Sequence, residues 1–241
     1  MRAIITFHTI DNSGSLLSFP PDTFSKFLSS LKKQDLDLCD LDTLLDPATR
    51  NGICITFDDG LRQTYRQALP ILRDYDVPAH VFLNTENVGG MNDWPSQPSG
   101  SPRLEMLSWG EIEKLYAAGI YIESHTNNHP DLRGLDDAEI VLECETADKI
   151  IENRLGRYPR YFAYPYGLSN ERVRAYTRDR YKGCVTTELR HLHEEEDMAA
   201  LPRLDSYYLK QPWLFEHLAS PIPRTYLLLR RFLRNLRAVS I

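Results

Sequence analysis

Short apolar runs alternate with helical patterns from one end of this 241-residue chain to the other. The runs are four to six residues long and rich in β-branched and aromatic residues, which is typical of buried strands. Seven of them are expected to be strands: Ala3–His8, Ile53–Phe57, Ala79–Leu83, Ile120–Ser124, Tyr161–Tyr164, Gly183–Thr187 and Ala200–Leu204. Repeated strand–helix units predict an α/β fold built on a parallel sheet.

The segments between these runs show where helices begin. Ser108 followed three residues later by Glu111 is a capping-box pattern, and it predicts a helix over Trp109–Ala118. Acidic residues favour the first turn of a helix, so Asp136 predicts the start of a long helix that runs toward Gly156.

The last part of the chain has a different pattern, with one apolar and one basic face on a helix expected over Thr225–Val239. The apolar residues are Tyr226, Leu229, Phe232, Leu233 and Leu236, and the basic ones are Arg230, Arg231, Arg234 and Arg237. We therefore expect a (β/α) domain over residues 1–210 and a basic amphipathic tail over residues 211–241. Two roles for the tail are open: packing against the acidic body, or peripheral contact with an anionic membrane through residues 224–239.

Composition narrows the classes of protein. The chain is 42% apolar with a net charge of −6, which suits one large core. Five arginines and no acid lie between His217 and Ile241, so residues 1–216 carry −11, with 23 Lys and Arg against 34 Asp and Glu. An acidic body argues against nucleic acid as a partner. The opening residues lack an export-signal pattern, and no apolar run is long enough to span a membrane. The four cysteines are scattered, as is common for free thiols in a reducing compartment. We therefore expect a cytoplasmic protein, which would be peripheral at the inner membrane face if the tail binds lipid.

Polar residues fall at the ends of the predicted strands. His8 ends the first run, Asp58 and Asp59 follow the second, His125 follows the fourth and Tyr166 lies just past the fifth. In parallel αβ barrels the chemistry collects at the carboxyl ends of the strands. These residues are therefore expected to meet at one mouth.

Two pairs of polar residues near these strand ends together suggest a metal site. Asp58 and Asp59 are adjacent carboxylates, and His125 and His129 are two imidazoles four residues apart. One carboxylate and two imidazoles can hold a divalent ion and leave positions open for water and substrate, while the other carboxylate moves a proton. The simpler alternatives are an Asp-Gly turn that caps a helix, and two exposed loop histidines. Pro130 favours a tight turn over a helix for the histidine pair.

Three segments resemble the first three motifs of the polysaccharide deacetylase superfamily, the chitooligosaccharide-deacetylase-like carbohydrate esterases of family four. They are Thr56-Phe-Asp-Asp-Gly60, His125-Thr-Asn-Asn-His-Pro130 and Phe162-Ala-Tyr-Pro-Tyr-Gly167. The likeness extends over roughly the first 205 residues and is most specific in the first two motifs. It implies a distorted seven-stranded parallel (β/α) barrel, here followed by the amphipathic C-terminal helix.

The resemblance also implies roles for individual residues. Asp59, His125 and His129 would hold a divalent metal, usually zinc, and Asp58 would be the general base. The reaction would be hydrolysis of the N-acetyl group of a carbohydrate, whether a polysaccharide, an oligosaccharide or a glycolipid intermediate. The backbone N–H of Tyr166, together with the metal, would stabilise the oxyanion.

The chain departs from the family pattern in two places. Ala163 stands where the family often has an arginine that orients the basic aspartate, and Arg203 is our candidate for that work. The general acid is often a histidine in a Leu-x-x-His motif, but the matching His217 lies beyond the last predicted strand. His8 is the better-placed candidate. His191 is expected in a solvated acidic loop.

Aromatic residues at a barrel mouth can stack on sugars, although most large aromatics fill cores. Of the aromatics near the motifs, Tyr166 and Tyr164 are the candidates for substrate binding. Two rival functions stay open: hydrolysis of a non-sugar amide or cyclic ureide on the same scaffold, and glycan binding with weak catalysis. A non-haem iron oxygenase also uses two histidines and a carboxylate, but a free Asp58 and alternating βα units do not suit it.

Overall fold

The computed structural model describes residues 1–239, with side chains for residues 1–234. Seven parallel strands form one sheet in the order β8-β7-β6-β5-β4-β1-β9. They are β1 (Arg2–Phe7), β4 (Gly52–Phe57), β5 (Ala79–Leu83), β6 (Tyr121–Ser124), β7 (Tyr161–Ala163), β8 (Gly183–Val185) and β9 (Leu204–Asp205). Every predicted run contributes one of these strands. A separate pair, β2 (Thr9–Ile10) and β3 (Ser18–Phe19), was not predicted.

The sheet curls into the distorted barrel that the motifs implied. At one end Leu204 of β9 pairs with Ile5 of β1, and at the other end Leu201 forms an isolated parallel bridge with Val185 of β8. Residues 201–205 therefore close the barrel. The predicted strand Ala200–Leu204 is broken there because Pro202 has no N–H to donate to a neighbouring strand.

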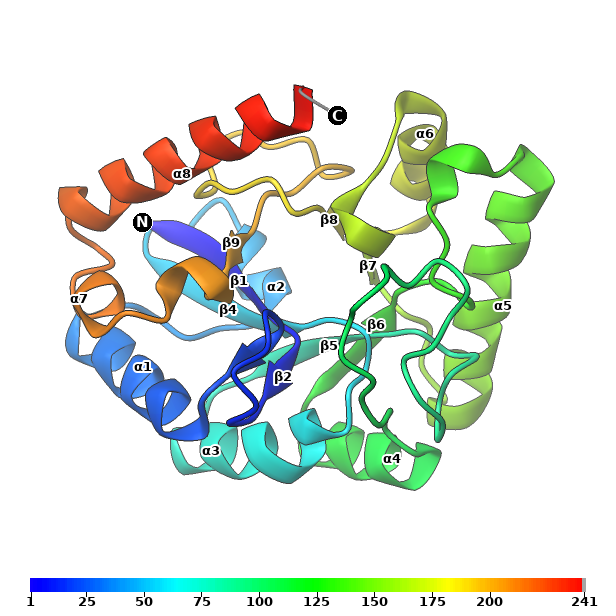
Figure 1. Cartoon of the computed structure of the whole chain (residues 1–241), viewed down its shortest axis with the longest axis horizontal. Helices are drawn as coiled ribbons and strands as arrows, with labels where there is room; N and C mark the ends of the chain where they lie inside the picture. Colours follow the sequence, from blue (N-terminus) through cyan, green and yellow to red (C-terminus); the bar gives the residue numbers. More distant parts are fainter. Residues whose placement is uncertain (240–241) are drawn as a thin grey trace.

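Helices surround the strands, as Figure 1 shows. The α-helices are α1 (Pro21–Lys33), α2 (Leu41–Leu45), α3 (Leu69–Asp74), α4 (Trp109–Ala117), α5 (Asp137–Leu155), α6 (Glu171–Arg180), α7 (Pro212–Phe215) and α8 (Pro221–Val239). One π-helical turn (Thr64–Ala68) precedes α3, and short 3-10 turns span Leu132–Gly134, Pro165–Gly167 and Ser206–Leu209. The capping box predicted for α4 is present, and α5 ends at Gly156 in the left-handed conformation, with φ 68°.

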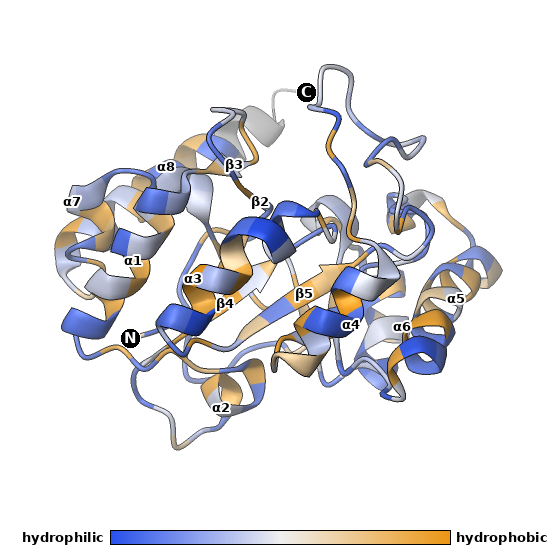
Figure 2. Cartoon of the chain, turned by 90° about the horizontal axis from the view of Figure 1, so that it is seen from below, coloured by the Kyte–Doolittle hydropathy of each residue, from blue (hydrophilic) through white to orange (hydrophobic). Residues whose placement is uncertain are grey.

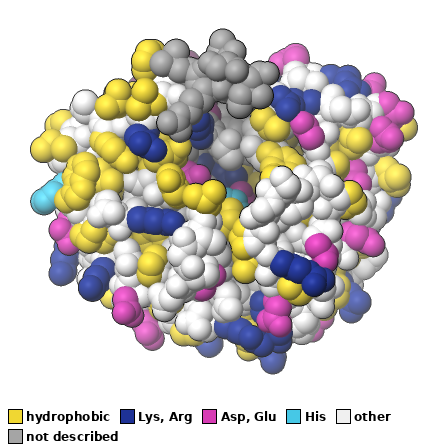
Figure 3. Space-filling view, viewed as in Figure 1, with side chains coloured by type: hydrophobic (Ala, Val, Ile, Leu, Met, Phe, Trp, Pro, Cys, Tyr) yellow, Lys and Arg dark blue, Asp and Glu magenta, His cyan; other side chains and the backbone are white. Residues whose placement is uncertain are grey.

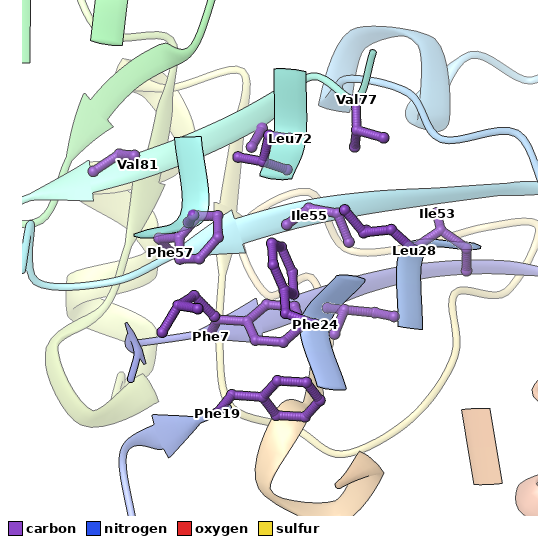
Figure 4. Packing of buried hydrophobic residues seen from close by; sticks show 14 of the residues in the cluster. Phe7, Phe19, Phe24, Leu28, Ile53, Ile55, Phe57, Leu72, Val77 and Val81 are labelled. Carbon is purple, nitrogen blue, oxygen red and sulfur yellow. The ribbon is translucent and has the colours of Figure 1, made fainter. Parts of the chain in front are cut away.

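Alternating residues of the strands face two different cores. In β1, Ala3, Ile5 and Phe7 pack against the surrounding helices, whereas Ile4 faces the barrel interior. Figure 4 shows the outer cluster, in which Phe7 lies beside Phe24 of α1. In Figure 2 the strands β4 and β5 are largely hydrophobic, while the helices around them carry both hydrophobic (orange) and hydrophilic (blue) residues. The apolar runs form strands because both of their faces are covered.

The C-terminal segment packs on the barrel. Phe215, Leu218 and Leu227 are buried in the same cluster as the outer face of β1, and the Phe215 ring lies 5.5 Å from that of Phe27. Among the described residues, no helix combines the length and the apolar character that crossing a bilayer would require.

Candidate metal centre and active-site cleft

The carboxyl ends of the strands open into a cleft of about 510 Å³. Its lining includes six residues that the sequence placed at strand ends or in the motifs: His8, Asp58, Asp59, His125, His129 and Tyr166. In Figure 3 the cleft is the hollow near the centre of the molecule, with histidine and acidic side chains visible inside it. The predicted convergence of separate segments at one mouth is confirmed.

The chain brings both aspartates into the cleft by breaking the alternation of β4. Asp58 continues the series Cys54, Thr56 and therefore faces the barrel interior. Asp59 would face outward, but its backbone is left-handed, with φ 71°, which turns its carboxylate back toward the mouth. Gly60 follows with φ 80°, and a Cβ there would lie 2.5 Å from Leu83. The shape of this turn thus requires glycine at position 60.

The two histidines come from a tight turn after β6, as Pro130 indicated. Thr126 and His129 are both left-handed, with φ 68° and 55°. The Nδ1 atom of His125 lies 2.7 Å from the carbonyl oxygen of Ala163, and since a carbonyl can only accept, this nitrogen carries the proton. The lone pair of neutral His125 is therefore on Nε2, which points into the cleft.

Three side chains converge on one point. The Nε2 atoms of His125 and His129 each lie 3.4 Å from Oδ1 of Asp59 and 3.2 Å from each other. Burial lowers the pKa of His129 despite its contact with Asp59, which favours the neutral imidazole that a metal needs. Two imidazole nitrogens facing each other with a carboxylate oxygen between them are a donor set that fits a divalent ion.

Asp58 stands outside this cluster and has its own partner. Arg203 donates two hydrogen bonds to it, from Nη1 to Oδ1 at 2.7 Å and from Nη2 to Oδ2 at 2.6 Å. Burial opposes ionisation of Asp58, but the charge and hydrogen bonds of Arg203 outweigh it, and the pKa of this carboxyl lies below its ordinary value. Arg203 is fully enclosed, and its Nε donates to the carbonyl of Thr186 at 2.9 Å, which fixes the plane of the guanidinium.

The two tyrosines predicted to bind substrate differ in position. Tyr166 lines the cleft with φ 60°, and its ring packs edge-on against His129 at 4.7 Å. Gly167 beside it has φ 70° and no room for a Cβ against Thr187. Tyr164 is completely buried, and its hydroxyl bonds to Thr177 and to the carbonyl of Ala199. The expectation for Tyr164 is corrected: it is a core residue that cannot reach a ligand in the cleft.

One residue of the cleft, Trp94, was not identified from the sequence, and His191 was misjudged. Trp94, in the long loop between β5 and α4, packs against His129 at 4.3 Å and donates from Nε1 to the Tyr166 hydroxyl at 3.1 Å. A tryptophan in a loop rich in Gly, Pro and Ser was the available signal. His191 is buried, contrary to the expectation of a solvated loop, whereas His8 lies at the cleft as expected.

Fold and site together define a (β/α)-barrel protein with a candidate divalent-metal centre at the carboxyl ends of its strands. The sequence profile of the polysaccharide deacetylase family matches residues 46–181, more than half of the chain, and the chain belongs to this family.

Individual relatives agree with this assignment. The chain is 27% identical over 208 residues to a putative polysaccharide deacetylase, YxkH, of Bacillus subtilis, a match covering 83% of this chain and 70% of that protein. It is 28% identical over 182 residues to poly-beta-1,6-N-acetyl-D-glucosamine N-deacetylases of Staphylococcus aureus, covering 70% of this chain and 58% of theirs. The match thus spans less than two thirds of the Staphylococcus aureus proteins.

Solved structures show the same fold. The Streptococcus pyogenes deacetylase PplD superposes with a TM-score of 0.72 at 22% identity, covering 85% of this chain and 91% of that one. IcaB from Ammonifex degensii superposes with a TM-score of 0.71 at 23% identity, and the match covers 85% of this chain and 93% of the IcaB chain.

Proposed function

We propose that this protein is a metal-dependent hydrolase that removes an N-acetyl group from a carbohydrate, with water as co-substrate and acetate and a free amine as products. The observation that carries the proposal is the division of labour between neighbouring carboxylates: Asp59 lies with His125 and His129, and Asp58 lies apart with Arg203. Family membership and the names of the Staphylococcus aureus relatives support the carbohydrate substrate.

The candidate site residues in the cleft have separate roles in this proposal. Asp59, His125 and His129 would hold the ion, and a His₂Asp set with open positions suits zinc. When bound, the ion would supply a Lewis acid that activates water and polarises the amide carbonyl. Asp58 takes the proton of the attacking water because its carboxylate is ionised and is not needed as a ligand.

The remaining steps fall to two residues at the edge of the cleft. His8 donates a proton to the departing nitrogen, so that the amine leaves neutral while acetate forms. The backbone N–H of Tyr166 makes no hydrogen bond to the described residues and is available to the oxyanion. The exposed part of the Tyr166 ring would contact the sugar, which is part of a polysaccharide, an oligosaccharide or a glycolipid intermediate.

For location, we propose a cytoplasmic protein that touches the inner face of an anionic membrane through residues 224–239. The support is limited to α8, which carries arginines and no acid and exposes several apolar side chains.

Metal analysis of two neighbouring variants tests the proposed chemistry. Asp58→Asn should retain zinc while acetate release from N-acetylglucosamine oligosaccharides falls at least 100-fold, because the base is lost and the ligands are intact. Asp59→Ala should lose both the zinc and the activity.

Two assays in parallel separate carbohydrate deacetylation from ureide hydrolysis: acetate release from N-acetylated sugars, and ring opening of hydantoin to N-carbamoylglycine. A wild-type protein that binds zinc and cleaves hydantoin but no N-acetylated sugar would refute the proposal. So would an Asp58→Asn variant with undiminished turnover.

A further inference from the structure

Helix α8 lies on the body with its basic side inward. Arg231 forms an ion pair with Glu188 and Arg234 donates to the carbonyl oxygen of Thr187 at 2.6 Å. Arg230 stacks over the ring of Tyr208, with 5.1 Å between its guanidinium carbon and the ring centre. An amphipathic helix on a globular domain normally buries its apolar stripe. Here arginines make the polar attachments, and most of the apolar stripe is left outside.

Five large apolar side chains in the described part of α8, residues 221–234, are exposed, and we call them the α8 stripe. They are Ile222 (68% exposed), Leu228 (54%), Leu229 (55%), Phe232 (60%) and Leu233 (41%). Leu229 follows Ile222 by seven positions, and Phe232 and Leu233 follow Leu229 by three and four, so these side chains share one face. Leu227, on the opposite face, is buried. The stripe continues onto α7, where Trp213 is half-exposed and packs edge-on against Tyr226.

Basic residues border the stripe on both sides. At 100° per residue, Arg224 lies next to Leu228 and Arg230 next to Leu233. The described helix and its flanks contain no acid, while residues 1–216 carry a charge of −11. An apolar face edged by arginines, with interfacial tryptophan and tyrosine beside it, matches the headgroup and acyl layers of an anionic bilayer.

A second copy of the chain fits this face less well. A symmetric contact would bring like charges together at the border of the stripe, because Arg224 is exposed there and neither helix carries an acid. The five side chains together expose on the order of 500 Å², below the ~800 Å² per partner of a stable interface. A bilayer needs no such area, because several inserted apolar side chains and a few basic contacts suffice for peripheral binding.

The stripe leads to the cleft. Thr187, whose carbonyl accepts from Arg234, is part of the cleft lining. On the other side, Lys210 donates to the carbonyl of Ser15, and the next residue, Leu16, is 74% exposed and also lines the cleft. Figure 3 shows hydrophobic side chains gathered at the upper left, over α7 and α8, on the same face as the central hollow. A membrane surface bound to the α8 stripe would therefore lie beside the opening of the cleft.

From this geometry we propose that the α8 stripe docks on a bilayer containing anionic lipids and sets the cleft at its surface, so that the substrate is an N-acetylated carbohydrate joined to a membrane lipid. The inference rests on the deacetylase function proposed above. It adds the lipid anchor of the substrate and the surface that brings enzyme and substrate together.

Vesicle binding and acetate release, measured on the full chain, test the inference. The variant carries Leu229→Glu and Phe232→Glu, and the control is Leu142→Glu, which alters an equally exposed leucine (66%) on α5, away from the stripe. Zinc-loaded proteins are sedimented with phosphatidylcholine vesicles with and without phosphatidylglycerol. Acetate release is followed from a soluble N-acetylglucosamine pentamer and from the same pentamer coupled to a phospholipid in those vesicles.

We expect the wild-type protein and Leu142→Glu to bind phosphatidylglycerol vesicles at least tenfold more tightly than the double variant. All three should act equally on the soluble pentamer, and the double variant should be at least tenfold slower on the lipid-linked one. Folding of each variant is checked by its thermal unfolding.

Different failures have different meanings. Activity on the soluble pentamer without vesicle binding by the wild-type protein overturns the inference and leaves the proposed function standing. Vesicle binding that depends on the stripe, without acetate release from either substrate, supports docking and refutes the proposed function. A dimer in solution that the double variant dissociates, with no vesicle binding, assigns the stripe to a second copy and overturns the inference. Equal slowing on both pentamers overturns the claim about the substrate.

Discussion

The ion pair between Arg203 and Asp58 sets both the ionisation and the orientation of the Asp58 carboxylate. A buried carboxylate would ordinarily resist ionisation, and Arg203 reverses that preference while holding both oxygens in one plane. Position 163, where the family often has an arginine, is an alanine in this chain. The carbonyl oxygen of Ala163 accepts a hydrogen bond from Nδ1 of His125. We therefore propose Arg203 as the residue that positions the base.

Replacing Arg203 with lysine should separate positioning from charge. Lysine keeps the positive charge but has one nitrogen, so it cannot bind both oxygens of Asp58 and also reach Thr186. We expect the variant to fold and to hold zinc, with kcat reduced about 100-fold and KM nearly unchanged, since a 1 Å displacement of a catalytic group has an effect of that order. Steady-state kinetics on the soluble pentamer measure both constants.

Arg180→Lys is the matched control, because Arg180 pairs with the buried Asp148 of α5 and does not line the cleft. It should lower the free energy of unfolding and leave kcat unaltered. Equal kcat for Arg203→Lys and the wild-type protein would show that the ion pair only stabilises the fold.

Single residues were predictable where chemistry and spacing coincided. The aspartate and histidine pairs come together as expected, because strand ends of a parallel barrel meet whatever the details of packing. Tyr164 was misassigned because its hydroxyl partners, Thr177 and Ala199, are remote in sequence. The side to which a residue turns just after a strand depends on backbone angles that the sequence does not display.

At the scale of elements, the segment between β8 and β9 is held under α8. His191 in this segment is buried beside Leu227, and burial, followed by the charges of Arg224 and the N-terminus, lowers its pKa to about 4. The acidic neighbours at 194–197 suggested a solvated loop. Burial arises from α8, which begins some thirty residues later, so no local pattern could indicate it.

His191 should make the protein less stable in acid. Its folded pKa of about 4 lies below the ordinary 6.5, so the unfolded chain takes up the proton more readily. This residue therefore lowers stability progressively as the pH falls from about 6.5 to about 4, by a total of about 3 kcal/mol. Urea unfolding at several pH values should show that His191→Gln removes this part of the pH dependence.

His193→Gln, which replaces an exposed histidine two residues away, is measured in parallel as the matched control. If the His191→Gln and wild-type curves stay parallel between pH 4 and 7, the histidine does not contribute.

For the whole molecule, the apolar cores and the metal cluster are separate. The cores lie between the sheet and the helices and inside the barrel, whereas Asp59, His125 and His129 lie at its open end. Several backbone strains gather at that end, since Asp59, Thr126, His129 and Tyr166 all have positive φ. The apolar cores stabilise the fold, and the folded barrel in turn positions the side chains of the site.

Removal of the metal should therefore abolish activity without unfolding the protein. Chelation is expected to lower the free energy of unfolding by about 4 kcal/mol relative to a thousandfold excess of zinc over its Kd, because the ion binds only the folded state. Zinc should restore both activity and stability. Urea titrations with and without chelator measure the difference, and Asp59→Ala should show none. Loss of all helical circular dichroism on chelation would contradict this.

The overall arrangement was accessible from the sequence because two-sided burial makes each strand an apolar run. The seven strands follow from that rule, and the starts of the long helices α4 and α5 follow from their capping residues. The manner of barrel closure could not be predicted, because the closing segment is interrupted at Pro202. Leu201 before the proline bridges to β8, and the two-residue β9 after it pairs with β1. The outward-facing stripe of α8 was also hidden, since amphipathicity shows two faces but not which one meets the body.

The closure of the barrel has a consequence for synthesis on the ribosome. Arg203 lies between Leu201, bridged to β8, and Leu204, paired with β1, and so belongs to the seam of the barrel. A nascent chain that has emerged only as far as residue 200 already contains both aspartates and both histidines. It still lacks the guanidinium that holds the base. The hydrogen bonds between Arg203 and Asp58 can therefore form only after residues 201–205 have been synthesised and have paired with β1 and β8.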